Sequence, residues 1–351
     1  MSDIQDLIIQ TATKLFADHC TTETLRLAEG GVWPAELWAV LERTGLTLAS
    51  LPETVGGAGG SLRDALAVLR VAGQFAVPLP LAETYLASWI LAASGITLPS
   101  GPLTVAFTRA DTAAFRFRRR ASTWTMTGSA SRVSWARHAH QLVALGQSED
   151  GLCLALLTPE RGTISPGQNL ASEPRDTVSF ADVEVTEVVP LAVTPDWVWS
   201  RAALTRSVLM VGALEGILQR TVRYASERVQ FGRPINRFQA IQQHLALLAG
   251  EVAAARTSVE AAAFAAEQED EATAAIAIAK IRVGEAAGQA AAIAHQVHGA
   301  MGYTYEYPLH FLTRRLWAWR DESGSESEWA GWLGRHIAAQ GAEALWPFLT
   351  A

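Results

Sequence analysis

The sequence predicts an α+β protein with an N-terminal helical domain, a middle antiparallel β domain and a C-terminal four-helix bundle. Apolar residues recur at spacings of three and four up to about residue 100 and again from about residue 197, which is typical of helices. Between about residues 101 and 190 the spacing changes to two, and turn sequences separate the short alternating runs. The predicted domains are therefore 1–100, 101–192 and 193–351.

The N-terminal domain is predicted to contain helices over residues 3–16, 34–45, 61–75 and 81–94. Pro34 suits the first turn of the second helix, and Pro78 and Pro80 separate the last two. Residues 51–60 are rich in glycine and are expected to form a turn, because glycine adopts backbone angles that other residues resist.

The middle domain is predicted to contain short strands over residues 103–107, 115–119, 123–127, 141–146, 152–158 and 177–185. Their spacing favours a small antiparallel barrel or sandwich. The C-terminal domain is predicted to contain long apolar helices over residues 199–229, 237–267, 271–299 and 326–345. Helices of this length and composition usually pack as a four-helix bundle.

Composition excludes several classes of protein. The 351 residues are 49% hydrophobic and 18% charged, which is sufficient for a large core. The net charge of −7 argues against a nucleic-acid interface, and two cysteines cannot form a disulfide framework. The acidic N-terminus does not look like a signal peptide, and the most apolar stretch, residues 81–98, is too polar to span a membrane. A cytoplasmic protein without nucleic-acid or membrane partners is expected.

Three groups of residues carry a resemblance to a known family. Residues 228–235 read Arg-Val-Gln-Phe-Gly-Arg-Pro-Ile and are followed by Phe238 and Gln239. Residues 296–303 read Gln-Val-His-Gly-Ala-Met-Gly-Tyr, and the N-terminal part contains Pro52, Glu53, Gly56 and Gly57. Together these residues resemble the acyl-CoA dehydrogenase family over nearly the whole chain. The family has the same order of domains as the one predicted from the spacing of apolar residues.

The resemblance implies that the chain binds FAD. In the family, the Arg of the Arg-x-Gln-Phe-Gly motif binds the pyrophosphate of the neighbouring subunit's FAD, and that residue is Arg228 here. A guanidinium suits this task because it donates two parallel hydrogen bonds. Phe231 would pack beside the cofactor, Gln239 and Gln296 would hydrogen-bond its adenylate part, and Ser134 stands where the family has a flavin-contacting Thr. Considered alone, Arg228 could simply interact with the dipole at the C-terminus of a helix.

The family's catalytic base is missing from its usual positions. The base is a carboxylate that removes the α-proton of the acyl-CoA, and Ser323 occupies its place here. A minority of the family carries the base 26 residues before the motif Arg, where this chain has Ala202. Serine without an activating partner is no base for such a proton. Glu322 is the best substitute. The alternative is a solvated acidic stretch at the start of the last helix, formed by Asp321, Glu322, Glu326 and Glu328.

The chain also departs from the family in the β domain. The family's flavin-cradling loop reads Thr-Glu-Pro-x-Ala-Gly-Ser-Asp, whereas residues 108–115 here read Thr-Arg-Ala-Asp-Thr-Ala-Ala-Phe. The chain thus keeps the residues that a subunit lends to its neighbour's FAD and lacks most of those for its own. This pattern is similar to the shorter, base-less subunit of bacterial two-gene α2β2 acyl-CoA dehydrogenases. That resemblance implies a tetramer, an acyl-CoA substrate from steroid or lipid breakdown, and electron-transferring flavoprotein as the acceptor.

Three alternatives stay open. The chain could be a homomeric dehydrogenase that uses Glu322 as its base, a flavin monooxygenase on the same fold, or a non-catalytic subunit that serves assembly. His295 and His298 lie three residues apart on one predicted helix, a spacing found in metal sites. No third ligand is evident, so no metal is predicted.

Overall fold

The computed structural model describes residues 3–52, 57, 59–107, 114–120, 123–268, 272–343 and 345–346. The chain divides into two compact units. The first unit contains Met1–Ala72 and Ala76–Ala202, and the second contains Gly73–Phe75 and Ala203–Ala351. Helices, then strands, then helices follow one another along the chain, so the predicted α+β order is confirmed.

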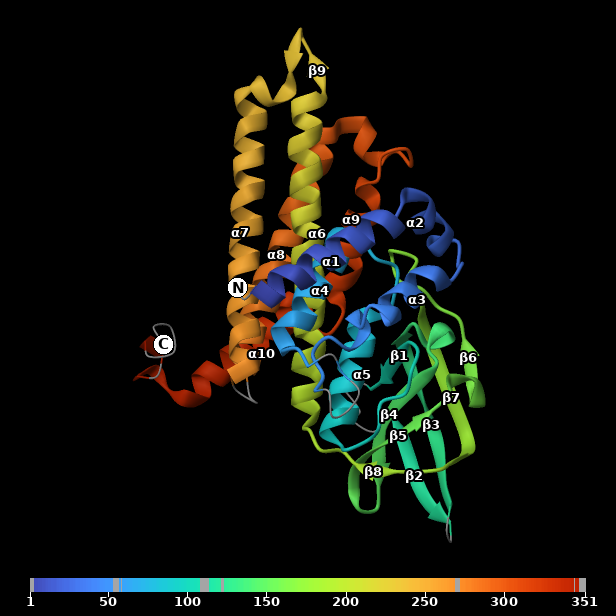
Figure 1. Cartoon of the computed structure of the whole chain (residues 1–351). Helices are drawn as coiled ribbons and strands as arrows, with labels where there is room; N and C mark the ends of the chain where they lie inside the picture. The colour runs from blue at the N-terminus through green and yellow to red at the C-terminus, as the bar shows by residue number, and fades with distance from the viewer. Residues whose placement is uncertain are drawn as a thin grey trace. The chain divides into compact units, whose positions relative to one another are not determined.

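The helices before the sheet are α1 (Asp3–His19), α2 (Thr22–Glu29), α3 (Ala35–Arg43), α4 (Leu62–Gln74) and α5 (Leu81–Ala93) (Figure 1). The sequence did not predict α2. This helix has only 8 residues and buries only Leu25, so its apolar pattern is too short to stand out in the sequence. Its start is instead fixed by a cap, because the Thr21 side chain accepts a hydrogen bond from the Thr24 N–H at 3.2 Å.

The strands of the first unit are β1 (Leu103–Ala106), β2 (Phe115–Arg120), β3 (Thr123–Ser134), β4 (Gln141–Ser148), β5 (Gly151–Leu157), β6 (Thr163–Ser165), β7 (Arg175–Val185) and β8 (Val189–Pro190). Among the described residues they form one sheet with the order β6-β7-β3-β2-β4-β5-β8, and β1 pairs with β4. The prediction of an antiparallel sheet is wrong at β4, because β1 and the start of β2 run parallel to it. The sheet is therefore mixed.

Strand β4 contributes to two apolar cores, because its successive side chains point to opposite faces of the sheet. Leu142 packs in the core that contains Phe115 of β2. Val143 packs in the other core, together with Ile90 of α5. Since both faces of β4 are covered, its sequence is almost continuously apolar over its central residues.

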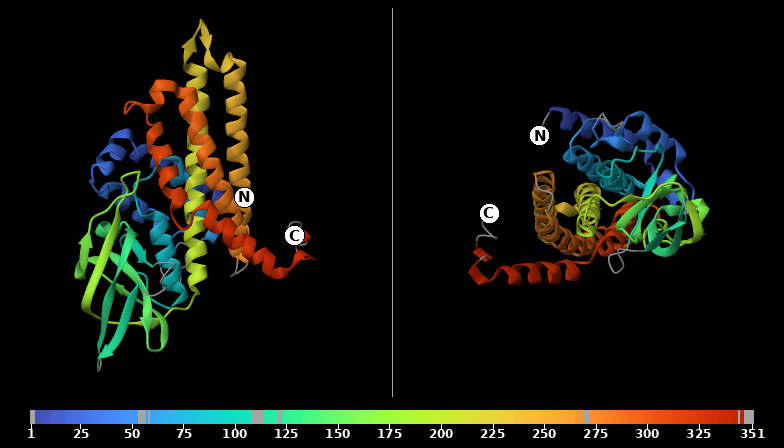
Figure 2. Two further views of the ribbon diagram at one scale, coloured as in Figure 1. Left: turned by 180° about the vertical axis from the view of Figure 1, so that it is seen from behind. Right: turned by 90° about the horizontal axis from the view of Figure 1, so that it is seen from below.

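The C-terminal helices are α6 (Pro195–Glu227), α7 (Gln239–Gln268), α8 (Thr273–His298), α9 (Leu309–Asp321) and α10 (Glu326–Gln340). In the second unit α6, α7, α8 and α9 stand side by side, and α10 leads away from them (Figures 1 and 2). The fourth helix of the bundle is thus α9, and not the predicted helix over residues 326–345. Helix α9 was not predicted because the polar residues Thr313 and Arg315 are buried within it and interrupt its apolar pattern.

Helix α6 is long and apolar enough to cross a membrane by length and composition alone. However, 83% of its most apolar window is buried inside the protein. A helix that is apolar on most sides is expected at the centre of a large helical core, so packing accounts for its composition.

Candidate functional site

The Arg-x-Gln-Phe-Gly motif forms a hairpin at the end of α6. Strand β9 (Val229–Gln230) pairs with β10 (Arg233–Pro234), so Phe231 and Gly232 make the turn between them. Both residues have positive φ, 54° and 79°, as tight hairpin turns require. A non-glycine residue in this region costs about 1–3 kcal/mol, and the Phe231 side chain is nevertheless 92% exposed. A strained, exposed aromatic residue indicates a contact site and not a role in the core.

A cavity of about 410 Å³ lies beside this hairpin, and we call it the helix-end cavity. Its walls come from the end of α6, the hairpin, the start of α7 and the end of α8. The lining includes Tyr224, Arg228, Phe231, Ile241, Gln296 and His298. The structure therefore brings together three of the predicted cofactor-binding residues: Arg228, Phe231 and Gln296. Gln239, the exposed first residue of α7, is not part of the lining as far as the described residues show.

Arg228 brings an unpaired positive charge to the helix-end cavity. Its N–H donates to the Tyr224 carbonyl and its carbonyl accepts from the Ile235 N–H, both at 2.8 Å, so its backbone is fixed. Within the described parts of the chain, no residue forms an ion pair or hydrogen bond with its guanidinium. Arg223, about one turn earlier, differs because it pairs with Glu227 at 2.8 Å. The Arg228 guanidinium is thus available for an anionic ligand.

This lining fits the pyrophosphate and adenylate end of FAD. The exposed guanidinium of Arg228 matches a pyrophosphate, and the exposed amide of Gln296 can both donate to and accept from an adenine ring. The Phe231 ring offers an apolar surface. The volume of the helix-end cavity also lies within the usual range of ligand sites.

Ser134 belongs to the first unit, where it ends β3. It is half-buried, pairs with Arg175 of β7, and its carbonyl accepts a hydrogen bond from the Thr104 hydroxyl at 2.6 Å. The next residue, Trp135, is buried with a φ of 59°, so the chain bends sharply there. Residues 108–115 replace the family's flavin-cradling loop, and residues 108–113 among them lie outside the described residues. Glu53 and Gly56 of the N-terminal motif also lie outside them.

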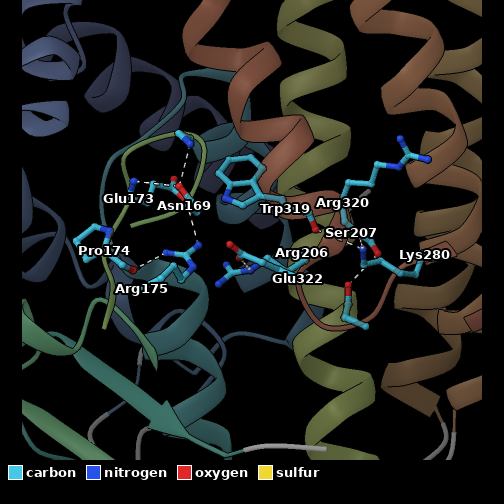
Figure 3. A network of polar contacts seen from close by, with 12 residues as sticks. Asn169, Glu173, Pro174, Arg175, Arg206, Ser207, Lys280, Trp319, Arg320 and Glu322 are labelled. Carbon is cyan, nitrogen blue, oxygen red and sulfur yellow. Dashed lines mark hydrogen bonds and ion pairs between the residues drawn. The ribbon is translucent and has the colours of Figure 1, made fainter. Parts of the chain in front are cut away.

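Glu322, the proposed substitute base, is engaged in a buried ion pair. Its Oε2 lies 2.8 Å from Nε of Arg206 on α6, and each side chain is 9% exposed (Figure 3). Ser323 follows with a φ of 55°, and its carbonyl accepts a hydrogen bond from Nε1 of Trp329 at 2.9 Å. Ala202, at the other base position, is a buried residue of α6. Protonation of Glu322 would cancel its charge in a buried ion pair, which is costly and argues against Glu322 as a base.

The expected solvated acidic stretch is wrong for Glu322 and Glu326. Glu326 ion-pairs with Arg320 and is only 17% exposed. Glu328 is exposed, but it forms a capping box with Ser325 at the start of α10. Ion pairs and the capping box therefore fix the turn between α9 and α10.

Lys280 of α8 caps the C-terminal end of α9. Its side chain is fully buried, and Nζ donates to the carbonyls of Trp319 at 3.3 Å and Arg320 at 2.6 Å (Figure 3). The last carbonyls of a helix have no partner within the helix, so this contact stabilises them. Sequence reasoning missed both Lys280 and Arg206. The available signal was a charge within a largely apolar segment of a long helix, where a charged side chain usually has a buried partner.

Lys280 should make stability depend on pH. Burial lowers the pKa of Lys280 from 10.5 to about 8, against the opposing effect of Glu326 and Glu322. The unfolded chain binds this proton more tightly, so the free energy of unfolding should increase as the pH rises from 8 towards 10.5. Between pH 7.5 and 9.5 we expect a gain of about 2 kcal/mol, which Lys280→Met should lack. Urea unfolding of both proteins at pH 7.5 and pH 9.5 measures this gain. If the free energy of unfolding of Lys280→Met increases as much as that of the wild type, Lys280 is not the cause of the pH dependence.

His295 and His298 have separate partners. Nε2 of His295 lies 3.2 Å from the Thr313 hydroxyl, whereas Nδ1 of His298 lies 2.7 Å from the Ala294 carbonyl. Among the described residues, no group of three or more His, Cys, Asp or Glu side chains is placed to hold a metal ion.

Comparisons with known proteins identify the family of this chain. Models of the acyl-CoA dehydrogenase N-terminal and C-terminal domains match residues 2–96 and 199–326. Acyl-CoA dehydrogenase IpdE2 of Mycobacterium tuberculosis is 31% identical over 318 residues, which cover 89% of this chain and 90% of that protein.

Solved structures share the fold over nearly the whole chain. A variant of the Tcur3481-Tcur3483 steroid ACAD is 25% identical, with a TM-score of 0.87 and coverage of 97% of this chain and 99% of that one. A chain of the ChsE4-ChsE5 complex from Mycobacterium tuberculosis has a TM-score of 0.87 at 22% identity, with coverage of 96% and 98%. Members of the family that these matches share are oxidoreductases acting on CH–CH groups, and their general reaction is FAD-dependent desaturation. This chain belongs to the acyl-CoA dehydrogenase family.

Proposed function

We propose that this chain is the base-less subunit of a heteromeric, FAD-dependent acyl-CoA dehydrogenase that desaturates steroid or other lipid-derived acyl-CoA thioesters. A second, longer acyl-CoA dehydrogenase chain would complete the enzyme, and electron-transferring flavoprotein would accept the electrons. The observation that carries this proposal is the buried ion pair between Arg206 and Glu322, because it engages the carboxylate next to the vacant base position at Ser323.

Desaturation requires a group that takes the α-proton from the thioester. Neither Ser323 nor Ala202 has a carboxylate, and Glu322 can accept a proton only by giving up its contact with Arg206. Dehydrogenation therefore depends on a carboxylate that another chain supplies.

The residues of this chain bind and orient the cofactor in this proposal. When bound, FAD accepts the hydride from the β-carbon of the substrate. Arg228 neutralises the pyrophosphate, Gln296 and Gln239 hydrogen-bond the adenylate part, and Phe231 packs beside it. Ser134 contacts the flavin part. The unpaired guanidinium of Arg228 and the exposed ring of Phe231 support this assignment.

The relatives support a two-chain enzyme. One solved structure, 25% identical to this chain, is a steroid ACAD named for two proteins, Tcur3481 and Tcur3483. An equivalent arrangement here explains why the chain keeps the motif residues that serve a neighbour's FAD and lacks both usual bases.

Expression together with a longer homologue that carries the base and the flavin-cradling loop tests this proposal. We expect the two chains to purify together and to reduce an artificial acceptor when acyl-CoA is added. Replacement of the homologue's base by Gln should abolish that reaction. An active flavoprotein formed by this chain alone would overturn the proposal.

A further inference from the structure

Three aromatic rings join the helix ends that carry Arg228 and Gln296. The ring of Tyr224 on α6 stacks on that of His298 at the end of α8, with centroids 4.4 Å apart and planes at 28°. Tyr307, which lies just before α9, is 4.8 Å from the ring of His298 and 5.6 Å from that of Tyr224. We call these three residues the aromatic stack.

Hydrogen bonds fix the aromatic stack to the backbone of both helices. The Tyr224 hydroxyl donates to the His298 carbonyl at 3.3 Å, and the Tyr307 hydroxyl donates to the Arg220 carbonyl at 3.4 Å. Nδ1 of His298 lies 2.7 Å from the Ala294 carbonyl. Because a carbonyl can only accept, Nδ1 carries the proton, and the His298 ring is held in one orientation.

We propose that Tyr224, His298 and Tyr307 are positioning residues that set the separation of Arg228 and Gln296, so that one dinucleotide contacts both. Arg228 lies one turn beyond Tyr224, and its N–H donates to the Tyr224 carbonyl at 2.8 Å. Gln296 precedes His298 by two residues in the same helix. A shift within the aromatic stack is therefore transmitted directly to both ligand-binding side chains. The inference rests on the proposed binding of FAD at the helix-end cavity.

Protonation of His298 should loosen this arrangement. The residue is 3% exposed, and burial lowers its pKa below the usual 6.5. The hydrogen bond to the Ala294 carbonyl opposes this shift, and His295 on the same helix adds a smaller lowering effect. It faces Tyr224 from α6 and Tyr307 from the segment before α9, and Arg228 lines the same helix-end cavity. Because His298 is buried between the two tyrosine rings, an imidazolium here would be poorly hydrated, and opening of the aromatic stack would relieve this cost. FAD affinity should therefore decrease as the pH falls below about 6.5.

Tyr224→Phe tests the hydrogen bond between the two helices, since it keeps the ring and removes only the hydroxyl. We expect FAD to bind about fivefold more weakly, measured by flavin fluorescence on the chain or on its complex with the base-carrying homologue. We also expect faster amide hydrogen exchange over residues 296–300 in the chain alone. Tyr303→Phe is the matched control, because Tyr303 is 76% exposed and stacks on His295 outside the aromatic stack. Identical results for the two variants would overturn the proposal.

His298→Phe tests the effect of protonation, since it keeps a ring that can stack but cannot take up a proton. In complex with the base-carrying homologue, we expect the wild-type chain and His295→Phe to bind FAD more weakly at pH 5.5 than at pH 8, and His298→Phe to bind it equally at both. Equal pH dependence in all three proteins would contradict the role of His298. If none of these complexes binds FAD at any pH, the proposed FAD site fails. Amide hydrogen exchange over residues 296–300 then still decides whether the aromatic stack couples the helix ends.

Discussion

Glu322→Gln is expected to lower the free energy of unfolding by about 3–5 kcal/mol, because it removes the carboxylate from a buried ion pair with Arg206. Both side chains are 9% exposed, so water cannot replace the lost partner. The same change should leave the dehydrogenation rate per bound flavin unchanged in the reconstituted two-chain enzyme, because Glu322 is not the proton acceptor. Urea unfolding of the chain and acceptor reduction by the complex measure the two effects.

Two further variants separate the ion pair from a general effect of losing a carboxylate. Glu227→Gln removes the partner of Arg223 in an exposed pair, with side chains 76% and 63% exposed, and should leave the unfolding midpoint unchanged. The double variant with Arg206→Met and Glu322→Leu should regain most of the stability, because two apolar side chains of similar volume can replace a buried ion pair. If Glu322→Gln keeps its stability but loses dehydrogenation, Glu322 is the base and the chain is a self-sufficient enzyme.

Arg228→Gln is expected to weaken FAD binding to the two-chain enzyme about 100-fold, because a bidentate contact between a guanidinium and a pyrophosphate is lost. Equilibrium dialysis with FAD, or the flavin retained after gel filtration, measures this loss. The free energy of unfolding of the chain without flavin should change little, since the Arg228 guanidinium has no partner among the described residues.

Arg223→Gln is the control for Arg228→Gln. The two arginines lie five residues apart at the end of α6, but Arg223 already pairs with Glu227 and does not line the helix-end cavity as described. We expect Arg223→Gln to retain FAD like the wild-type protein. Equal flavin loss in both variants would indicate a general electrostatic effect, and retention of FAD by Arg228→Gln would remove Arg228 from the site.

The fold was predictable where apolar residues follow a regular period. Helices such as α4 and α7 match the expected ranges closely because packing repeats along them. Prediction failed for α2, which depends on the Thr21 cap, and for α9, whose buried face includes Arg315. The parallel pairing of β1 with β4 was also missed, because alternation along a strand contains no information about the direction of its neighbour.

The site was predictable only in part. Arg228, Phe231 and Gln296 were found because they belong to recognisable motifs at helix ends, and the structure places them around the helix-end cavity. The contact between Arg206 and Glu322 joins residues that are distant in the sequence, so no local sequence pattern predicts it. The same is true of the bond between Tyr224 and the His298 carbonyl, which depends on how α6 and α8 pack.

The most direct measurement is the number of FAD molecules per chain, obtained from the visible absorption spectrum and the protein concentration. We predict that the chain purified alone contains little FAD, and that mixing with a base-carrying homologue restores close to one FAD per shared site. A chain that purifies alone with one FAD and dehydrogenates acyl-CoA would contradict its assignment as the base-less subunit.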